Sequence, residues 1–238
     1  MGKVVKRYTS EIWRNFSVFA NWPLNKNVQI GDVGFLTPAK TFERQTTLYD
    51  MKDGKNLNIK VRSSNSVGDS VYSSTKGISI KFKVEGQAPD PGSTLVKANA
   101  GVTIHFKKKG AIIYQVWKHK LEEIESPDNL APVIYDLYKE EKWNPEWVVV
   151  SSIIQASAVT IFMSSSSEAV AEIQANASVE TPQFNLADIG AKLAFSRNKD
   201  LEIQELAKDN VKPFFYLSCL KGIRSEKPVF RKYGKYGV

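Results

Sequence analysis

Lysine and arginine are the residues of this chain whose numbers and positions point most directly to a chemistry. The 238 residues carry a net charge of +8. Residues 1–14 hold four basic side chains against one acidic one, giving +3, and residues 222–238 hold five against one, giving +4. Basic ends suit a phosphate-rich surface, either anionic lipid or nucleic acid, although charged termini also simply aid solubility. The candidates for lipid-headgroup binding are Lys3, Lys6, Arg7, Arg14, Lys107, Lys108 and Lys109.

The other reactive residues form no catalytic or metal-binding pattern. His105 falls on the polar face of an expected strand, and His119 lies in a Lys/Glu-rich segment. A single cysteine, Cys219, excludes an intramolecular disulfide and, with only two histidines, argues against a zinc site. A short acidic run is too closely spaced to flank a substrate and is interpreted as helix-surface charge: Glu122, Glu123 and Glu125. We therefore expect no enzyme, no cofactor and no metal.

Two segments alternate between apolar and polar residues over long stretches. The first, at about 76–107, consists of Gly77–Glu85 and Val96–Lys107 around a Pro/Gly turn. The second, at about 168–196, consists of Glu168–Val179 and Ala187–Ser196. Period two on both sides of a turn predicts a long β-hairpin with one apolar and one wet face. The apolar positions are Ile78, Ile80, Phe82, Val84, Val102, Ile104, Phe106, Ala171, Ile173, Ala175, Ile189, Ala191, Leu193 and Phe195.

The two hairpins look like copies of one unit. Gly101 recurs as Gly190 and Phe106 recurs as Phe195, both with an offset of 89 positions. Two copies are too few for a solenoid array, so we expect both hairpins in one fold.

Helices are expected on either side of the first hairpin. Apolar residues at every third or fourth position predict an amphipathic helix over about 3–19. It would either pack on the sheet or lie at a lipid–water boundary, where Trp13 and Trp22 would fit. A second helix is expected at about 129–141, after the start signal Pro127-Asp128.

Further strands complete the expected sheet. Trp147–Met163 is apolar and β-branched enough for a buried central strand, and Val211–Leu220 predicts a closing strand. Gly31 and Gly34 interrupt another strand where the backbone must turn or be closely approached. The fold class expected is α+β: a twisted antiparallel sheet with two long amphipathic hairpins and a few packing helices.

One domain is expected over residues 1–223, followed by a basic, aromatic tail at 224–238. We expect this tail to be mobile or to fold back over the hairpin faces. No apolar run reaches the roughly 18–20 residues of a transmembrane helix. The N-terminus shows no signal-peptide core and no myristoylation motif, so the default compartment is the cytoplasm.

Alternation of this kind has two explanations. It describes any antiparallel sheet with one face in water. It also describes strands that cross a bilayer, which need about 9–11 residues each and a closed barrel. One protomer would supply four strands, so a ring of protomers would be needed to close the edges.

The order of these parts resembles the pore-forming amino-terminal domain of the gasdermins, over roughly Leu48–Ile223. The parts that carry the resemblance are the hairpin Gly77–Lys107, the helix Asn129–Tyr138 with the strand after Trp147, the hairpin Glu168–Ser196 and the strand Val211–Leu220. No large C-terminal repressor domain and no N-terminal acylated cysteine are expected, so compact fungal gasdermin-like death proteins are the better match.

The resemblance implies a cytoplasmic protein that binds acidic phospholipids, with Lys3–Phe19 as the basic helix. It further implies a homo-oligomeric ring, alone or with a related protein as activating partner. Inserted hairpins would then open a β-barrel pore in the plasma or inner membrane during cell death or defence. No nucleic-acid partner is implied.

Two other functions stay open from the residues alone. One is a peripheral lipid-binding or scaffold β-protein that never inserts. The other is a single-strand nucleic-acid-binding β-protein that uses the basic ends with aromatic residues such as Tyr114 and Trp117.

Overall fold

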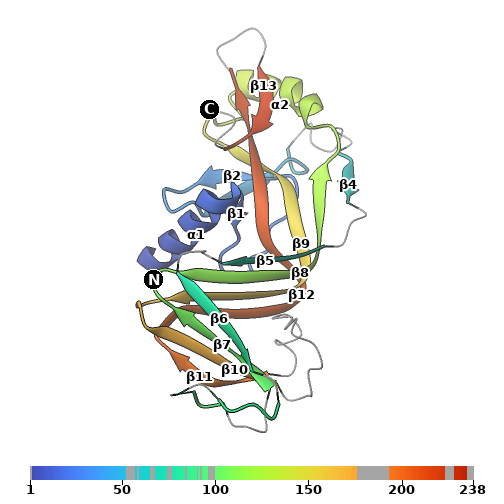
Figure 1. Cartoon of the computed structure of the whole chain (residues 1–238). Coiled ribbons are helices and arrows are strands. Elements are labelled where there is room, and N and C mark those ends of the chain that lie inside the picture. The colour runs from blue at the N-terminus through green and yellow to red at the C-terminus, as the bar shows by residue number, and fades with distance from the viewer. Residues whose placement is uncertain are drawn as a thin grey trace. The chain divides into compact units, whose positions relative to one another are not determined.

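The computed structural model shows a mixed α+β protein built mostly of antiparallel strands, which confirms the predicted fold class (Figure 1). It describes residues 2–51, 57, 59–64, 68–73, 77–83, 85–89, 91, 93–95, 100–175, 193–222 and 228–234. Within these ranges, the side chains of residues 69–73, 175, 193–197, 206, 208 and 209 are not described.

The described elements include two α-helices separated by strands. The α-helices are α1 (Gly2–Phe16) and α2 (Leu130–Lys139), and the short 3₁₀ turn η2 (Pro127–Asn129) directly precedes α2. The strands are β1 (Phe19–Ala20), β2 (Asp32–Leu36), β3 (Phe42–Thr47), β4 (Val61–Ser63), β5 (Gly68–Ser73), β6 (Ile78–Lys83), β7 (Ala100–Phe106), β8 (Ile112–Ile124), β9 (Val148–Ser164), β10 (Ala169–Ala175), β11 (Leu193–Lys199), β12 (Leu201–Lys221) and β13 (Val229–Lys232).

The chain divides into two compact units. The first unit comprises Met1–Val67, Lys120–Gln155 and Lys212–Val238. The second, which we call the hairpin unit, comprises Gly68–His119 and Ala156–Val211. The long strands β8, β9 and β12 each contribute residues to both units.

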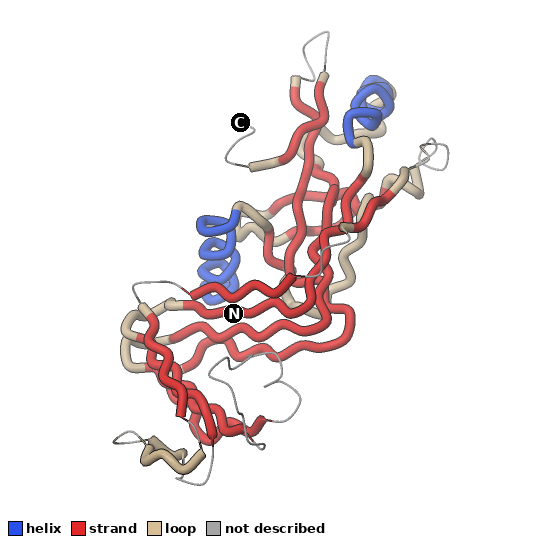
Figure 2. Tube along the Cα trace, turned by 45° about the vertical axis from the view of Figure 1, so that its right-hand side comes forward, coloured by secondary structure: helices blue, strands red, loops and turns tan. Residues whose placement is uncertain are grey.

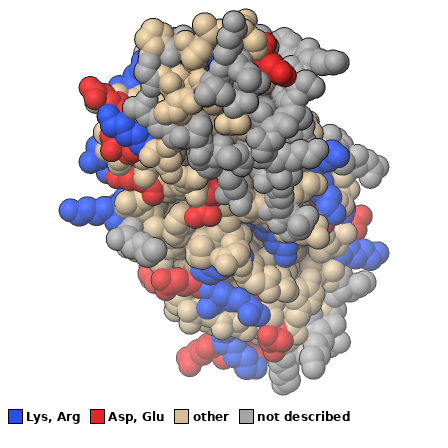
Figure 3. Space-filling model, turned by 90° about the horizontal axis from the view of Figure 1, so that it is seen from below, with Lys and Arg blue, Asp and Glu red and all other residues tan. Residues whose placement is uncertain are grey.

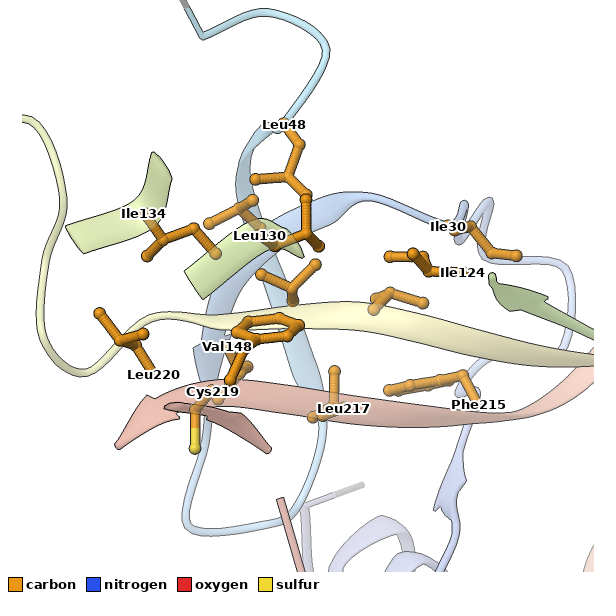
Figure 4. Close-up of a cluster of buried hydrophobic side chains, with 14 of the residues drawn as sticks. Ile30, Leu48, Ile124, Leu130, Ile134, Val148, Phe215, Leu217, Cys219 and Leu220 are labelled. Atoms are coloured by element: carbon orange, nitrogen blue, oxygen red, sulfur yellow. The ribbon is translucent and has the colours of Figure 1, made fainter. Parts of the chain in front are cut away.

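The core of the first unit lies between α2 and the strands β2, β9 and β12. Leu130, Ile134 and Leu137 recur at helical spacing on α2 and are almost fully buried. They belong to one apolar cluster with side chains of β9 and β12 (Figure 4). The predicted helix at 129–141 and the predicted strand at 147–163 are therefore confirmed to within two residues at each end.

Helix α1 uses its apolar stripe for packing. Tyr8 and Ile12 have no exposed surface, and the Trp13 ring stacks on Phe19 with centroids 4.4 Å apart. The helix ends at Phe16, earlier than predicted, because Ser17 adopts a left-handed conformation with φ 55° that helices use to terminate. Of the two placements expected for this stripe, the structure shows packing within the protein.

The glycines of the β2 region behave as the sequence predicted. Gly31 has a φ of 89°, a left-handed conformation that L side chains rarely adopt. A Cβ at Gly34 would lie 2.0 Å from the carbonyl oxygen of Glu43 on the neighbouring strand β3. Gly31 therefore allows a turn, and Gly34 allows the backbone of β3 to approach closely.

The acidic run was predicted wrongly as helix-surface charge. Glu122 and Glu123 lie on strand β8, where Glu123 forms an ion pair with Arg62 of β4 at 2.7 Å. In this part of β8, Glu122 lies opposite Ser63 and Glu123 opposite Arg62 of β4. Pairing with β4 therefore places these two carboxylates on a strand rather than on a helix.

The hairpin unit has two layers of strands. In one layer, β6 pairs with β7, β7 with β10, and β10 with β11, all antiparallel. The other layer is formed by β5 and the nearby parts of β8, β9 and β12. Figure 2 shows the four hairpin strands as a separate layer beside the long strands.

Both predicted hairpins are present among the described residues, with changed bounds. Strand β7 is described from Ala100 onward, and residues 96–99 of the predicted strand lie outside the described residues, whereas β11 runs on to Lys199 rather than ending at Ser196. The four strands are six or seven residues long as described. These lengths cannot be compared with the roughly 9–11 residues that cross a bilayer, because each strand ends next to residues outside the described ones, namely 84, 96–99 and 176–192.

The described part of the tail does not behave as expected. Residues Val229–Lys232 form β13, which pairs with Ser218–Lys221 of β12. Phe230 is 3% exposed and belongs to the core of the first unit, and the Tyr233 ring lies 6.1 Å from that of Phe19. The prediction of a mobile segment over the hairpin faces is therefore wrong for residues 228–234, because β12 offers a free edge and an apolar surface.

We expect the tail to contribute to stability. Phe230→Ala should lower the free energy of unfolding by about 3–5 kcal/mol, as buried Phe truncations do. The control is Val229→Ala on the same strand, which removes a side chain that is 39% exposed and should change stability by less than about 1 kcal/mol. Urea denaturation measures both, and equal small effects would contradict the docked tail.

Candidate functional site

The hairpin sheet is the candidate site, because it holds the residues predicted to enter a membrane. Cross-strand pairing places these residues in rows on a single face. In one row, Phe82 of β6 lies opposite Val102 of β7, which lies opposite Ile173 of β10. In the next row, Ile80 of β6 lies opposite Ile104 of β7. The alternation of β6, β7 and β10 is thus in register, as a continuous apolar face requires, whereas the pairing of β10 with β11 shifts register between Glu172 and Ile173.

This apolar face is buried in the hairpin unit. Val102, Ile104 and Ile173 have no exposed surface, and Phe106 is 1% exposed. They pack with residues from the other layer, namely Ala111 just before β8, Ile113 of β8, Phe162 of β9 and Leu201 of β12. In this state the predicted membrane-inserting residues form the core of a two-layer sandwich.

The predicted face extends beyond its buried part. Phe82, near the end of the outer strand β6, is 46% exposed, and Ile78 and Ile80 are half-buried. Three predicted positions lie outside the described residues: Val84, Ile189 and Ala191. Three others have described backbones in β10 or β11 but undescribed side chains: Ala175, Leu193 and Phe195.

The opposite face of the sheet is only partly wet, which corrects the prediction. Thr103 is 5% exposed, Lys83 is 8% exposed and Glu172 is 1% exposed. The segment Ser93–Leu95 covers this part of the face, and we call it the strap. The backbone N–H and the hydroxyl of Thr94 both donate to Glu172 Oε2, at 2.9 and 2.6 Å.

Leu95 anchors the strap by packing. It is 2% exposed and lies against Gly101 of β7. A Cβ at Gly101 would lie 2.8 Å from Leu95 Cδ1 and 2.7 Å from the carbonyl oxygen of Ile173. The strap can therefore approach the sheet closely only because residue 101 has no side chain. Burial of Glu172 under the strap could not be predicted from the sequence, because Glu172 alternates like any solvated strand residue.

We expect the strap to depend on the buried carboxylate. Thr94→Val keeps the side-chain shape but removes the hydroxyl from Glu172, which should cost about 1.5–3 kcal/mol, as for hydrogen bonds to charged groups. The control Thr94→Ser, at the same exposed position, keeps the hydroxyl that donates to Glu172 and should cost less than about 0.5 kcal/mol. Urea unfolding and hydrogen exchange at residues 93–95 measure both, and unchanged exchange in Thr94→Val would contradict the anchoring.

The predicted basic turn lies at the end of the hairpin sheet. Lys107, Lys108 and Lys109 are exposed, on the connection between β7 and β8. Ser164 holds this connection, because its hydroxyl donates to the Lys108 carbonyl oxygen at 2.7 Å and accepts from the Ala111 N–H at 3.0 Å. Gly110 closes the turn with a φ of 76°.

Two other turns are fixed to each other at the same end of the sheet. The Ser165 N–H donates to the carbonyl oxygen of Asp200 at 2.8 Å, and the Ser166 hydroxyl donates to its carboxylate. We call residues 107–110, 164–168 and 199–200 the turn cluster. The serines that precede the second hairpin therefore hold neighbouring turns together through hydrogen bonds.

The basic residues of α1 are in the first unit. Lys3, Lys6 and Arg14 are exposed, and Arg7 is half-buried. Arg14 forms an ion pair with Glu11 at 3.3 Å. On the face of the molecule seen in Figure 3, basic and acidic side chains are interspersed rather than separated by sign. Lipid binding through this helix would rest on a few exposed cations.

The aromatic pair suggested for nucleic-acid stacking is not a surface platform. Tyr114 is 5% exposed on β8, and Trp117 is half-buried. A base can stack only on an accessible ring face, so burial of Tyr114 argues against that residue as a stacking platform.

The lone cysteine is a core residue. Cys219 is 6% exposed and belongs to the apolar cluster of the first unit (Figure 4). Burial raises the pKa of its thiol, and Lys221 lowers it to a lesser extent. Only the thiolate is reactive, so the folded protein should protect this side chain.

We expect Cys219 to be slow toward a thiol reagent. At pH 8 the folded protein should react with Ellman's reagent more slowly than the urea-unfolded chain, because the side chain is buried and its raised pKa lowers the fraction of reactive thiolate. Absorbance measures both rates. Immediate labelling of the folded protein would contradict the buried position and would show that the thiol is accessible enough to form an intermolecular disulfide.

Comparison with known proteins gives no family for this chain: no protein-family model matches it, and no curated protein sequence matches it. Among the described residues, no helix is both long and apolar enough to span a bilayer. The same residues contain no group of three or more His, Cys, Asp or Glu side chains that would hold a metal ion. The geometry of the hairpin unit is therefore the main guide to function.

Proposed function

We propose that this protein permeabilises membranes. In the proposal, it binds an acidic phospholipid surface, assembles with further copies of itself, and inserts its two hairpins as the wall of a pore. It would be cytoplasmic while folded as described here and would act at the plasma or inner membrane. The link to cell death or defence rests on the resemblance to the gasdermin pore-forming domain.

The observation that carries the proposal is the register of the hairpin sheet. Two hairpins that are far apart in the sequence pair through β7 and β10, with Val102 opposite Ile173 and Thr103 opposite Glu172. Apolar side chains share one face and polar side chains share the other. A pore wall needs this arrangement, with lipid on one side and water on the other.

The buried state of the apolar face limits when insertion can occur. Exposing Val102, Ile104, Phe106 and Ile173 to water would cost roughly 6–12 kcal/mol at about 1.5–3 kcal/mol for each side chain. This approaches the whole stability of an ordinary domain, about 5–15 kcal/mol. Lipid tails are as apolar as the protein core, so transfer directly into a membrane avoids most of this cost. Opening would therefore be coupled to the membrane surface.

The edges of the hairpin sheet support assembly. Within the described residues, β6 and β11 are the outer strands of the four-stranded sheet. Unpaired backbone groups on such strands can pair with another chain. Strand β6 of one copy beside β11 of the next would extend the sheet from protomer to protomer.

Dye release from vesicles tests the proposal directly. Phosphatidylcholine vesicles that contain phosphatidylserine should leak when the full chain is added, and pure phosphatidylcholine vesicles should not. Binding without leakage would support a peripheral scaffold instead. If the protein neither binds the vesicles nor makes them leak, and instead binds single-stranded nucleic acid tightly and in a salt-dependent way, a nucleic-acid-binding function would be supported.

One substitution separates insertion from simple misfolding. Phe82 lies in the apolar rows but is 46% exposed, so Phe82→Arg leaves the sandwich core intact. If this position enters the bilayer, arginine there costs up to about 2–4 kcal/mol for each subunit near mid-membrane, and leakage should fall strongly.

Val61→Arg is the matched control for this substitution. Val61 is also 46% exposed, and the change adds the same charge to β4 of the first unit. It should leak like the unchanged protein. Normal leakage by a folded Phe82→Arg variant, with circular dichroism as the check on folding, would remove β6 from the pore wall.

A further inference from the structure

A basic cavity lies on the polar face of the hairpin sheet, beside the turn cluster. It has a volume of about 560 Å³ and is open to solvent. Hydrogen-bond donors from three strands and two turns line it: Ser79, Lys81, His105, Lys107, Ser167 and Lys199. The strap covers the neighbouring part of the same face, and Lys81 borders both regions.

Strand register explains why these donors converge. Ser79 lies opposite His105, His105 lies opposite Val170, and Val170 lies opposite Lys199. The four residues therefore form one row across the whole sheet. Strands lie about 4.8 Å apart, so His105 and Lys199 are about 10 Å apart at the backbone, with Val170 as the floor between them. Long lysine side chains can reach a ligand above this floor.

The surrounding turns give the cavity a fixed rim. The Lys107 N–H donates to the carbonyl oxygen of Gly77 at 2.8 Å, which places the lysine at the end of β6 and β7. The Glu168 N–H donates to the Ser166 hydroxyl at 3.1 Å, which shapes the turn that contributes Ser167. The cavity is thus preorganised by backbone hydrogen bonds rather than assembled from loose surface chains.

The charge of the lining selects an anion. Three lysines face one acidic lining residue, Glu168, which gives +2 before any contribution from His105. A phosphomonoester carries about −1.5 to −2 at pH 7 and offers three acceptor oxygens. Lysine binds phosphate as a point charge, whereas planar carboxylates favour the fork of arginine, which is not among the lining residues.

We propose that this cavity binds a phosphomonoester. Lys107 and Lys199 neutralise it from two sides, and the hydroxyls of Ser79 and Ser167 donate to its oxygens. The ligand is either the headgroup of a membrane lipid, such as phosphatidic acid, or a free phosphate in solution. This site requires only the folded hairpin unit, so it holds whether or not the protein forms pores.

The two histidines provide a site-specific test in the full chain. His105 lines the cavity, whereas His119 lies on β8 beside Gly68. In a titration with inorganic phosphate at fixed pH and ionic strength, the imidazole NMR signals of His105 should shift and saturate, and those of His119 should stay in place. Equal, non-saturating drift of both histidines would overturn the proposal.

Matched variants assign the binding to the cavity. Lys107→Gln with Lys199→Gln should weaken the phosphate response of His105 at least about tenfold, because both cations that flank the ligand are removed. Lys60→Gln with Lys139→Gln makes the same change of charge at exposed positions in the first unit and should leave the response unchanged. Circular dichroism checks folding, and equal loss in both pairs would show only a general charge effect and overturn the site.

Vesicle flotation distinguishes the two sources of the phosphate. Stronger binding to phosphatidic acid than to phosphatidylserine at matched surface charge, lost in the cavity variants, assigns a lipid headgroup. Equal binding to both vesicles, with the His105 response retained, assigns a free phosphate. Because dye release is not measured in these experiments, failure of the site and failure of the proposed pore remain distinguishable.

Discussion

The packing of the hairpin sheet on the long strands β8, β9 and β12 is the interaction on which the rest of the structure depends. Val102, Ile104, Phe106 and Ile173 become fully buried only because β7 and β10 pair in register and turn one face toward Phe162 and its neighbours. A shift of one residue in that pairing would move every apolar side chain of a strand to the opposite face. Register and burial therefore stabilise each other.

The second face of the sheet has a different construction. The strap closes one part of it through a buried carboxylate, Glu172, and through the side chain of Leu95. The part beside the turn cluster stays open and collects lysine side chains. A buried carboxylate is stable only while its hydrogen bonds are intact, so the strap and the sheet must separate together if this face is to meet water. The same strands thus carry a closed polar region and an open basic one.

The first unit supplies features that the hairpin unit lacks. Its core joins α2, β9 and β12 to the docked tail strand β13, and α1 buries Tyr8 and Ile12 while its basic residues stay exposed. The described part of the tail, residues 228–234, therefore belongs to a folded core, and removal of the Phe230 side chain would act through stability. Under the proposed function, restraint comes from burial of the apolar face and from the strap, which are both inside the hairpin unit.

The sequence by itself determined the local features of this protein. Period-two alternation located the four hairpin strands, helical spacing located α1 and α2, and Gly31 and Gly34 marked a turn and a close approach, because these patterns depend only on neighbours along the chain. The tertiary structure alone decided which strands pair and what covers each face. Glu172 alternates like a solvated residue but is buried, and Phe230 lies in a basic tail but enters a core. His105 and Lys199 lie in one row across three strands. Pairing and burial depend on contacts between residues far apart in the chain, and a single sequence carries no local signal for them.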